Sequence, residues 1–168
     1  MGCSDYVKEL KYLQIRLDQS NMDEPQIKEA LLEKAAEQST IDVPEDQVER
    51  EYTALVQAAK QKIRYEYMAE GKPFYGFPES LYTALESLRA EAYCSVKTEL
   101  LLQAVIEAEH LEISREELER EGLASAKRLE VTPEMARMFY GDDYGLLKND
   151  LLRRKAIDLI YEIGRAHV

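Results

Sequence analysis

"TIDVPEDQVEREY" (residues 40–52) and "HLEISREELEREG" (residues 110–122) repeat one pattern at two places in the chain. In each, a helical pattern ends and two apolar residues one position apart follow, so both side chains point the same way from an extended stub. A new helical pattern then begins at once. We therefore predict two similar junctions, in which the stub is pinned to neighbouring helices and a new helix starts.

The residues that open each new helix support this prediction. Pro44 supplies the fixed φ suited to a first helical turn, while Ser114 and Glu117 have the spacing of a capping box. Acidic residues follow at the positive end of each helix dipole. A weaker third copy, "LEVTP" (residues 129–133), also leads into a helix. For this third copy the alternative is a helix start of the general kind, unrelated to the other two.

Helical spacing of apolar residues dominates the rest of the chain. Tyr6, Leu10, Leu13 and Leu17 predict a first helix. The stretch "GKPFYGFP" (residues 71–78) separates two long helical patterns, which predicts an antiparallel helical hairpin. No segment of useful length alternates with period two, so the predicted fold class is all-α. The expected helices cover about residues 4–20, 27–38, 44–70, 79–109, 112–122, 131–141 and 146–160.

Composition and charge exclude several classes of partner. The chain has 168 residues, of which 45% are hydrophobic and 33% charged, as in globular proteins. Its net charge of -11 opposes binding to nucleic acid or to an anionic membrane surface. No apolar run reaches the roughly 18 residues that a membrane-spanning helix needs. We expect a cytoplasmic protein that binds neither nucleic acid nor membrane.

The cysteines and histidines do not form a pattern typical of an enzyme. Cys3 and Cys94 have no metal or redox spacing; Cys94 is expected in the core, and Cys3 after "MG" fits an engineered start or a trimmed lipoprotein. A di-iron helical bundle needs two Glu-x-x-His motifs. Glu107 and His110 supply one, but His167 has no glutamate three residues earlier. We expect a surface histidine at position 110, no catalytic residues, and no metal or other cofactor.

Three segments together resemble a known family. In order and spacing they are similar to the C-terminal domain of trigger factor, the bacterial ribosome-associated chaperone, from about residue 8 to about residue 163. The segments are "LLEKAAEQSTIDVPEDQVEREY" (31–52), "SLRAEAYCSVKTELLLQAVIEAEHLEISREELER" (87–120) and "PEMARMFYGDDYGLLKNDLLRRKAIDLIYE" (133–162).

The resemblance implies an elongated helical domain with protruding arms. Residues 1–168 would form one chaperone-type domain, with N-terminal helices (4–43), a long hairpin arm (44–110) and a second arm with the body (111–168). It would bind unfolded or nascent polypeptides without ATP, and a homodimer is a further expectation. The sequence shows no counterpart of the family's ribosome-binding and isomerase domains, so neither activity is carried over. We expect either a fragment of a longer trigger factor or a free-standing relative.

The candidate contacts with polypeptide are aromatic residues and a methionine, whose apolar faces adapt to varied partners. The alternative is that they pack the hairpin turn or the base of an arm; we expect Phe77 and Phe139 in the core and Phe74 and Tyr75 exposed. A different function, a helical scaffold that dimerises or docks one folded partner, would use similar apolar patches. The candidates are Tyr65, Tyr67, Met68, Phe74, Tyr75, Phe77, Phe139, Tyr140 and Tyr144.

Overall fold

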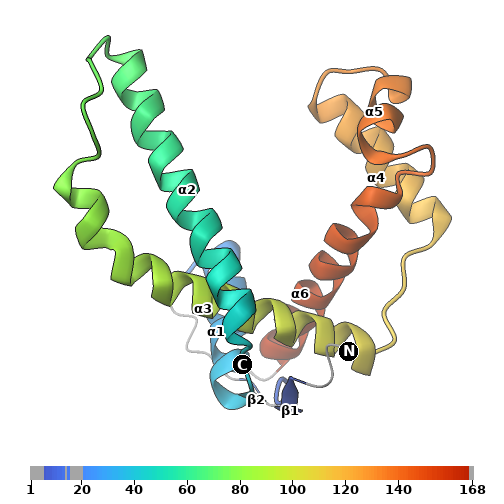
Figure 1. Cartoon of the computed structure of the whole chain (residues 1–168). Helices are drawn as coiled ribbons and strands as arrows, with labels where there is room; N and C mark the ends of the chain where they lie inside the picture. The colour runs from blue at the N-terminus through green and yellow to red at the C-terminus, as the bar shows by residue number, and fades with distance from the viewer. Residues whose placement is uncertain (1–5, 14, 16–20, 167–168) are drawn as a thin grey trace.

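A computed structural model describes residues 6–13, 15 and 21–166, and these form two helical arms on a shared base (Figure 1). This confirms the predicted all-α class with protruding arms. The elements in chain order are β1 (Val7–Glu9), α1 (Glu24–Gln38), β2 (Thr40–Ile41), α2 (Glu45–Ala69), α3 (Glu79–Ala108), α4 (Arg115–Arg128), α5 (Pro133–Tyr140), the 3-10 helix η2 (Gly145–Leu147) and α6 (Lys148–Ala166).

The predicted first helix over residues 4–20 is wrong. Residues 7–9 form strand β1, which pairs antiparallel with β2, so that Val7 lies opposite Ile41. The amide of Asp42 donates to the carbonyl of Tyr6 at 2.7 Å. The extended stub at residues 40–42 has backbone N–H and C=O groups that need hydrogen-bond partners, and β1 supplies them. This pairing outweighs the helical spacing of the four apolar residues on which the prediction rested. The rest of that prediction, residues 4, 5, 14 and 16–20, lies outside the described residues.

The base holds the larger core. Leu31 and Ala35 of α1, Leu101 and Leu102 of α3 and Ala156 of α6 are all fully buried there. Helix α6 comes close to α1 because residue 164 is glycine. A Cβ at Gly164 would lie 2.6 Å from Cδ1 of Leu31, closer than side chains approach.

Each of the two junctions has an extended stub, but the helix before the stub ends differently in the two. At the first junction Ile41 and Val43 both pack against the base core, as predicted. At the second only Leu111 does so, and Ile113 belongs to neither core. After α1 the chain goes straight into the extended conformation at Ser39. After α3, His110 is left-handed (φ 49°) and the Leu111 amide donates to the carbonyl of Ile106 at 3.0 Å. This second ending is a Schellman motif.

The third stub follows α4, which ends in the same way as α3. Glu130 is left-handed (φ 53°), and the Val131 amide donates to the carbonyl of Ala126 at 3.0 Å. Thr132 then caps α5, accepting from the amide of Met135. Ser114 and Glu117 form the predicted capping box at the start of α4. Pro44 is the N-cap of α2 in an extended conformation, so it lies one position before the helical turn expected for it.

The first arm consists of α2, the loop of residues 70–78 and the outer part of α3. It is the predicted hairpin, and its helices pack on each other along the arm (Figure 1). Of the residues of α2 only Val48 is buried. Cys94 of α3 is exposed, so its predicted place in the core is wrong. The buried face of α3 in this region passes through Ala92 and Val96, and residue 94 lies off it.

The second arm consists of α4, α5, η2 and the start of α6, and it has a core of its own. Tyr144, only 2% exposed, is buried there with Ala126, Ala136 and Leu147. A Cβ at Gly122 of α4 would overlap the Tyr144 ring. The ring therefore packs directly on the helix backbone, and glycine is the residue that allows it.

Candidate functional site

The tip of the first arm holds three aromatic rings in edge-to-face contact. The ring centroids of Tyr67 and Phe74 are 5.7 Å apart, and those of Phe74 and Phe77 are 5.1 Å apart. The chain turns at Gly71, which is left-handed (φ 65°) and ends α2 in another Schellman motif. We call Tyr67, Phe74 and Phe77 the tip cluster.

Two cations from α2 lie over this cluster. The Arg64 guanidinium is 5.7 Å from the Phe74 ring centroid and 5.2 Å from that of Phe77. The Lys60 ammonium is 5.5 Å from the Phe77 centroid. Such contacts hold a charge over an apolar face and leave the head of the side chain accessible to water.

Beside the tip cluster the arm exposes further apolar side chains. Tyr75 is 92% exposed, Met68 71% and Tyr65 67%. Phe74 is 39% exposed, and it and Tyr75 are exposed as predicted. Tyr67 is half-buried, and so is Phe77, which belongs to neither core although it was expected in one. The sequence-predicted residues of this arm therefore lie together, at the end farthest from the base (Figure 1).

The predicted residues of the second arm separate into surface and core. Phe139 is 56% exposed, so the expectation that it packs in the core is wrong. Helix α5 is short and buries only Ala136, which leaves Phe139 and Met138 outside. Tyr140 is half-buried against the second core. Tyr144 is buried against Gly122, so it is not available to contact a bound polypeptide.

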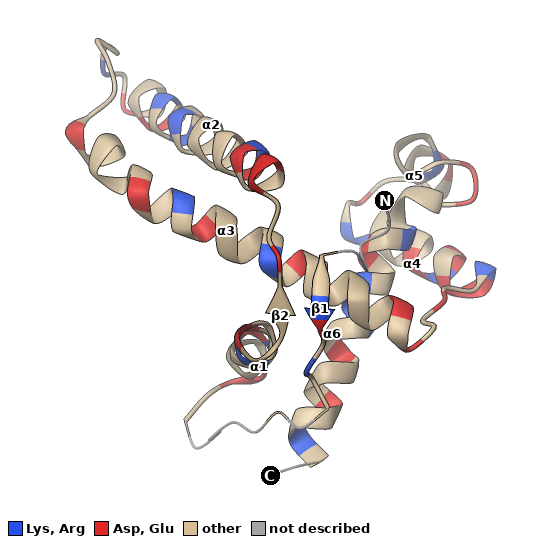
Figure 2. Ribbon diagram, turned by 60° about the horizontal axis from the view of Figure 1, so that its bottom comes forward, with Lys and Arg blue, Asp and Glu red and all other residues tan. Residues whose placement is uncertain are grey.

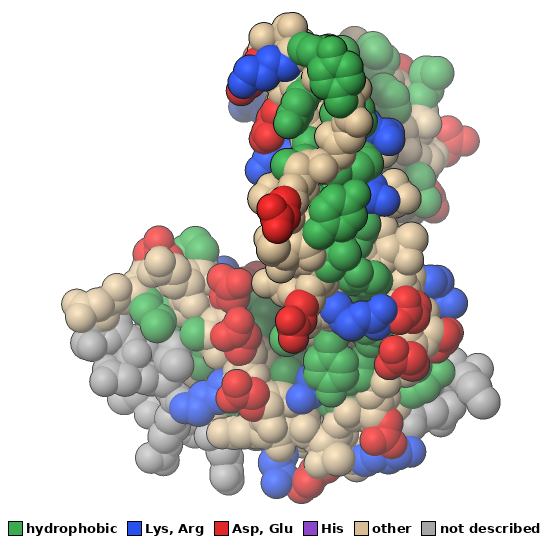
Figure 3. Space-filling model, turned by 60° about the vertical axis from the view of Figure 1, so that its left-hand side comes forward, with side chains coloured by type: hydrophobic (Ala, Val, Ile, Leu, Met, Phe, Trp, Pro, Cys, Tyr) green, Lys and Arg blue, Asp and Glu red, His purple; other side chains and the backbone are tan. Residues whose placement is uncertain are grey.

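A groove of about 290 Å³ runs along the first arm between α2 and α3, and sequence reasoning missed it. Tyr52, Val56 and Lys60 line it from α2, and Leu81, Tyr82 and Leu85 from α3. Figure 3 shows hydrophobic side chains in a band along this arm, with charged groups at its edges. The sequence could have indicated this groove, because α2 and α3 carry apolar residues outside their core-facing stripes, such as the exposed Tyr82.

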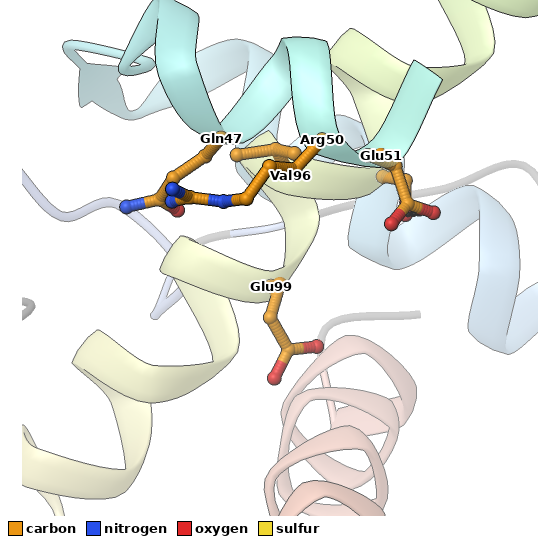
Figure 4. Close-up of a pocket in the computed structure, with 6 residues that line it drawn as sticks. Gln47, Arg50, Glu51, Val96 and Glu99 are labelled. Carbon is orange, nitrogen blue, oxygen red and sulfur yellow. Dashed lines mark hydrogen bonds between the residues drawn. The ribbon is translucent and has the colours of Figure 1, made fainter. Parts of the chain in front are cut away.

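The hollow at the root of the same arm is polar. It measures about 410 Å³, and Figure 4 shows Gln47, Arg50 and Glu51 of α2 facing Val96 and Glu99 of α3. A second hollow of about 270 Å³ lies between α3 and α6, where Arg153 donates to Glu99 at 2.8 Å. Ile106 and Leu152 also line this second hollow, so of the two only the one between α2 and α3 is mainly polar.

Ion pairs join α4 to α6 in the second arm. Lys155 contacts Glu117 at 2.6 Å, and Arg154 donates to Glu121 at 3.0 Å. The hydrogen bond from Lys155, with that from the Ser114 amide, lowers the pKa of Glu117 to about 2. The Arg154 and Arg128 guanidiniums lower the pKa of Glu121. These carboxylates remain charged and orient the arm.

The described residues offer exposed apolar surfaces for binding. No group of histidine, cysteine and acidic side chains within them could hold a metal ion. His110 is exposed at the end of α3, as predicted. Burial and the hydrogen bond to Glu109 raise the pKa of Tyr12 to about 12, which keeps this phenol protonated. Among the helices that the structure describes, none is long and apolar enough to cross a membrane.

Comparisons with known proteins agree on one family. The family model for the bacterial trigger factor protein C-terminus matches residues 8–162. Trigger factor of Exiguobacterium sp. is 33% identical over 146 residues, covering 83% of this chain and 33% of its own length. That of Shouchella clausii is 32% identical over 138 residues, covering 81% and 32%.

A solved structure shares the fold. It is a structure of domains of trigger factor from Thermotoga maritima, with a TM-score of 0.61 and 22% identity, and the match covers 82% of this chain and 81% of that one. At this identity the likeness concerns the fold alone. The chain spans about a third of the length of the curated relatives it matches.

Proposed function

This chain belongs to the family of the bacterial trigger factor C-terminus, and on that premise we propose that it holds unfolded or nascent polypeptide without ATP. Both arms would take part, each through exposed aromatic and methionine side chains. We also propose residues 1–168 as one domain divided at about residues 43 and 110, located in the cytoplasm. In a full-length relative, peptidyl-prolyl isomerase activity would belong to other domains.

The observation that carries this proposal is the apolar surface at the ends of both arms. Tyr75, Met68 and Tyr65 on the first arm and Met138 and Phe139 on the second are more than half exposed. Burying apolar surface releases roughly 25 cal/mol per Å². Several separate patches of this size support weak holding of varied chains and ready release.

Suppression of aggregation tests the proposal. The chain should slow aggregation of several unrelated denatured proteins at near-stoichiometric ratios, followed by light scattering. The triple variant Tyr65→Ser, Met68→Ser, Tyr75→Ser should lose most of this effect, because it removes the apolar patch without touching a core. Met22→Ser, an exposed methionine before α1 on the base, is the matched control and should leave protection unchanged.

The opposite results would favour the scaffold function instead. Protection of no denatured protein, together with a tight complex with one folded partner, would refute the chaperone proposal. Equal protection by the wild type and the triple variant would refute the part assigned to the first arm. Far-ultraviolet circular dichroism of each variant shows that its helices are intact.

A further inference from the structure

The protein as a whole is acidic, but the groove between α2 and α3 is not. None of its lining residues has a carboxylate, although the chain has 33 acidic residues. Its walls are apolar or neutral apart from Lys60, which lies at the end nearer the tip. Figure 2 shows mostly acidic residues at the base of α2 and a basic stretch in its outer half. In the sequence this stretch is Lys60, Lys62 and Arg64, and Glu66 and Glu70 follow it.

The positive charge at this end of the groove has no carboxylate partner in the part of the chain that the structure describes. Among the described residues, neither Lys60 nor Arg64 takes part in an ion pair, and both lie over the ring of Phe77. At the other end, Arg89 lies 4.4 Å from the centroid of Tyr52 and is paired with Glu49 at 2.5 Å. One end therefore carries free positive charge, and the other is compensated.

We propose that this groove binds extended apolar segments that carry an acidic residue at the end facing the tip. Tyr52 to Lys60 spans about 12 Å of helix, at about 1.5 Å per residue, which is the length of about four extended residues. Apolar side chains of the segment lie against Tyr82 and Val56, and its carboxylate lies near Lys60 and Arg64. This inference rests on the proposed polypeptide binding and names the class of segment.

Three labelled peptides test it by fluorescence anisotropy. Each has four alternating leucines and phenylalanines followed by two glutamates, two glutamines or two lysines. We expect the glutamate peptide to bind about fivefold more tightly than the glutamine peptide, as one exposed ion pair supplies, and the lysine peptide to bind most weakly. The advantage of the glutamate peptide should shrink as salt is raised.

Two substitutions of the same kind locate the effect. Lys60→Gln should remove the preference for glutamate and leave the glutamine peptide unchanged. Lys62→Gln, two residues along the same helix and outside the groove, is the matched control and should keep the preference. Tyr82→Ala should weaken all three peptides, because it removes an apolar wall.

The results separate this inference from the proposed function. Equal binding of the three peptides, no binding of the glutamate peptide, or an equal effect of both lysine substitutions would overturn the inference. If aggregation is still suppressed, the proposed function stands without it. If the groove is instead covered by a second copy of the chain, sedimentation will show a dimer that Tyr82→Ala dissociates, and the inference is then wrong.

Discussion

The two arms are held together in different ways. The first is a hairpin whose α2 buries only Val48, so half-buried residues and ring contacts at the tip hold it together. The second has a compact core, in which Tyr144 packs on the backbone at Gly122. Because local stability follows buried apolar contact, the second arm should behave as a unit, whereas the first should open gradually from its tip.

Filling the space at Gly122 should have the largest effect on this contrast. Gly122→Leu places a side chain where the Tyr144 ring lies, which should cost about 3 kcal/mol or more and disorder the second arm. Hydrogen exchange should rise in α4 and α5 and remain unchanged in α2. Ala124→Leu, at an exposed position of the same helix, should have little effect. Unchanged protection of α4 in Gly122→Leu would contradict the packing described.

Val48→Ala tests the first arm in the same way. It removes two methyl groups from the only buried position of α2, and we expect a loss of about 2 kcal/mol, measured by urea denaturation. The increase in exchange should begin at the root of α2. Ala54→Gly on the exposed face costs only helix propensity, about 1 kcal/mol. A loss no greater than that would mean that Val48 does not anchor the arm.

Substitutions at the residues with left-handed backbone should have a smaller effect, and they should stabilise the protein. His110→Gly and Glu130→Gly should each raise the free energy of unfolding by about 0.5–1 kcal/mol, because glycine adopts this conformation without a Cβ clash. Thermal melting measures the change. His110→Ala keeps the Cβ and should give no gain. Destabilisation by glycine at either position would contradict the Schellman ends.

The smallest predicted change in stability appears only at acidic pH. The folded-state pKa of Glu117 is about 2, against 4.5 for the ordinary side chain, so its ion pair with Lys155 contributes stability above pH 4.5. That contribution is lost as the pH falls from 4.5 towards 2. Melting curves of Glu117→Gln should show less of this decrease than the wild type, and Glu116→Gln, an exposed neighbour, should match the wild type.

The sequence was sufficient for features set by local patterns. Helical spacing and the Gly/Pro break predicted α2, α3 and their hairpin, and the capping box at Ser114 was correct. The strand β1 could not be predicted, because its only reason to be extended is a partner more than thirty residues away. Residue type alone cannot separate Phe139 from Tyr144, since one faces water and the other meets Gly122 across the arm.

The close approach of Leu31 and Gly164 also bears on the order of folding. These residues come from the two ends of the described chain, so the base core cannot close until α6 is present. The arms depend on contacts between residues nearer in sequence, which form sooner. During synthesis the hairpin of α2 and α3 can therefore assemble first, and the last helix then completes the support beneath it.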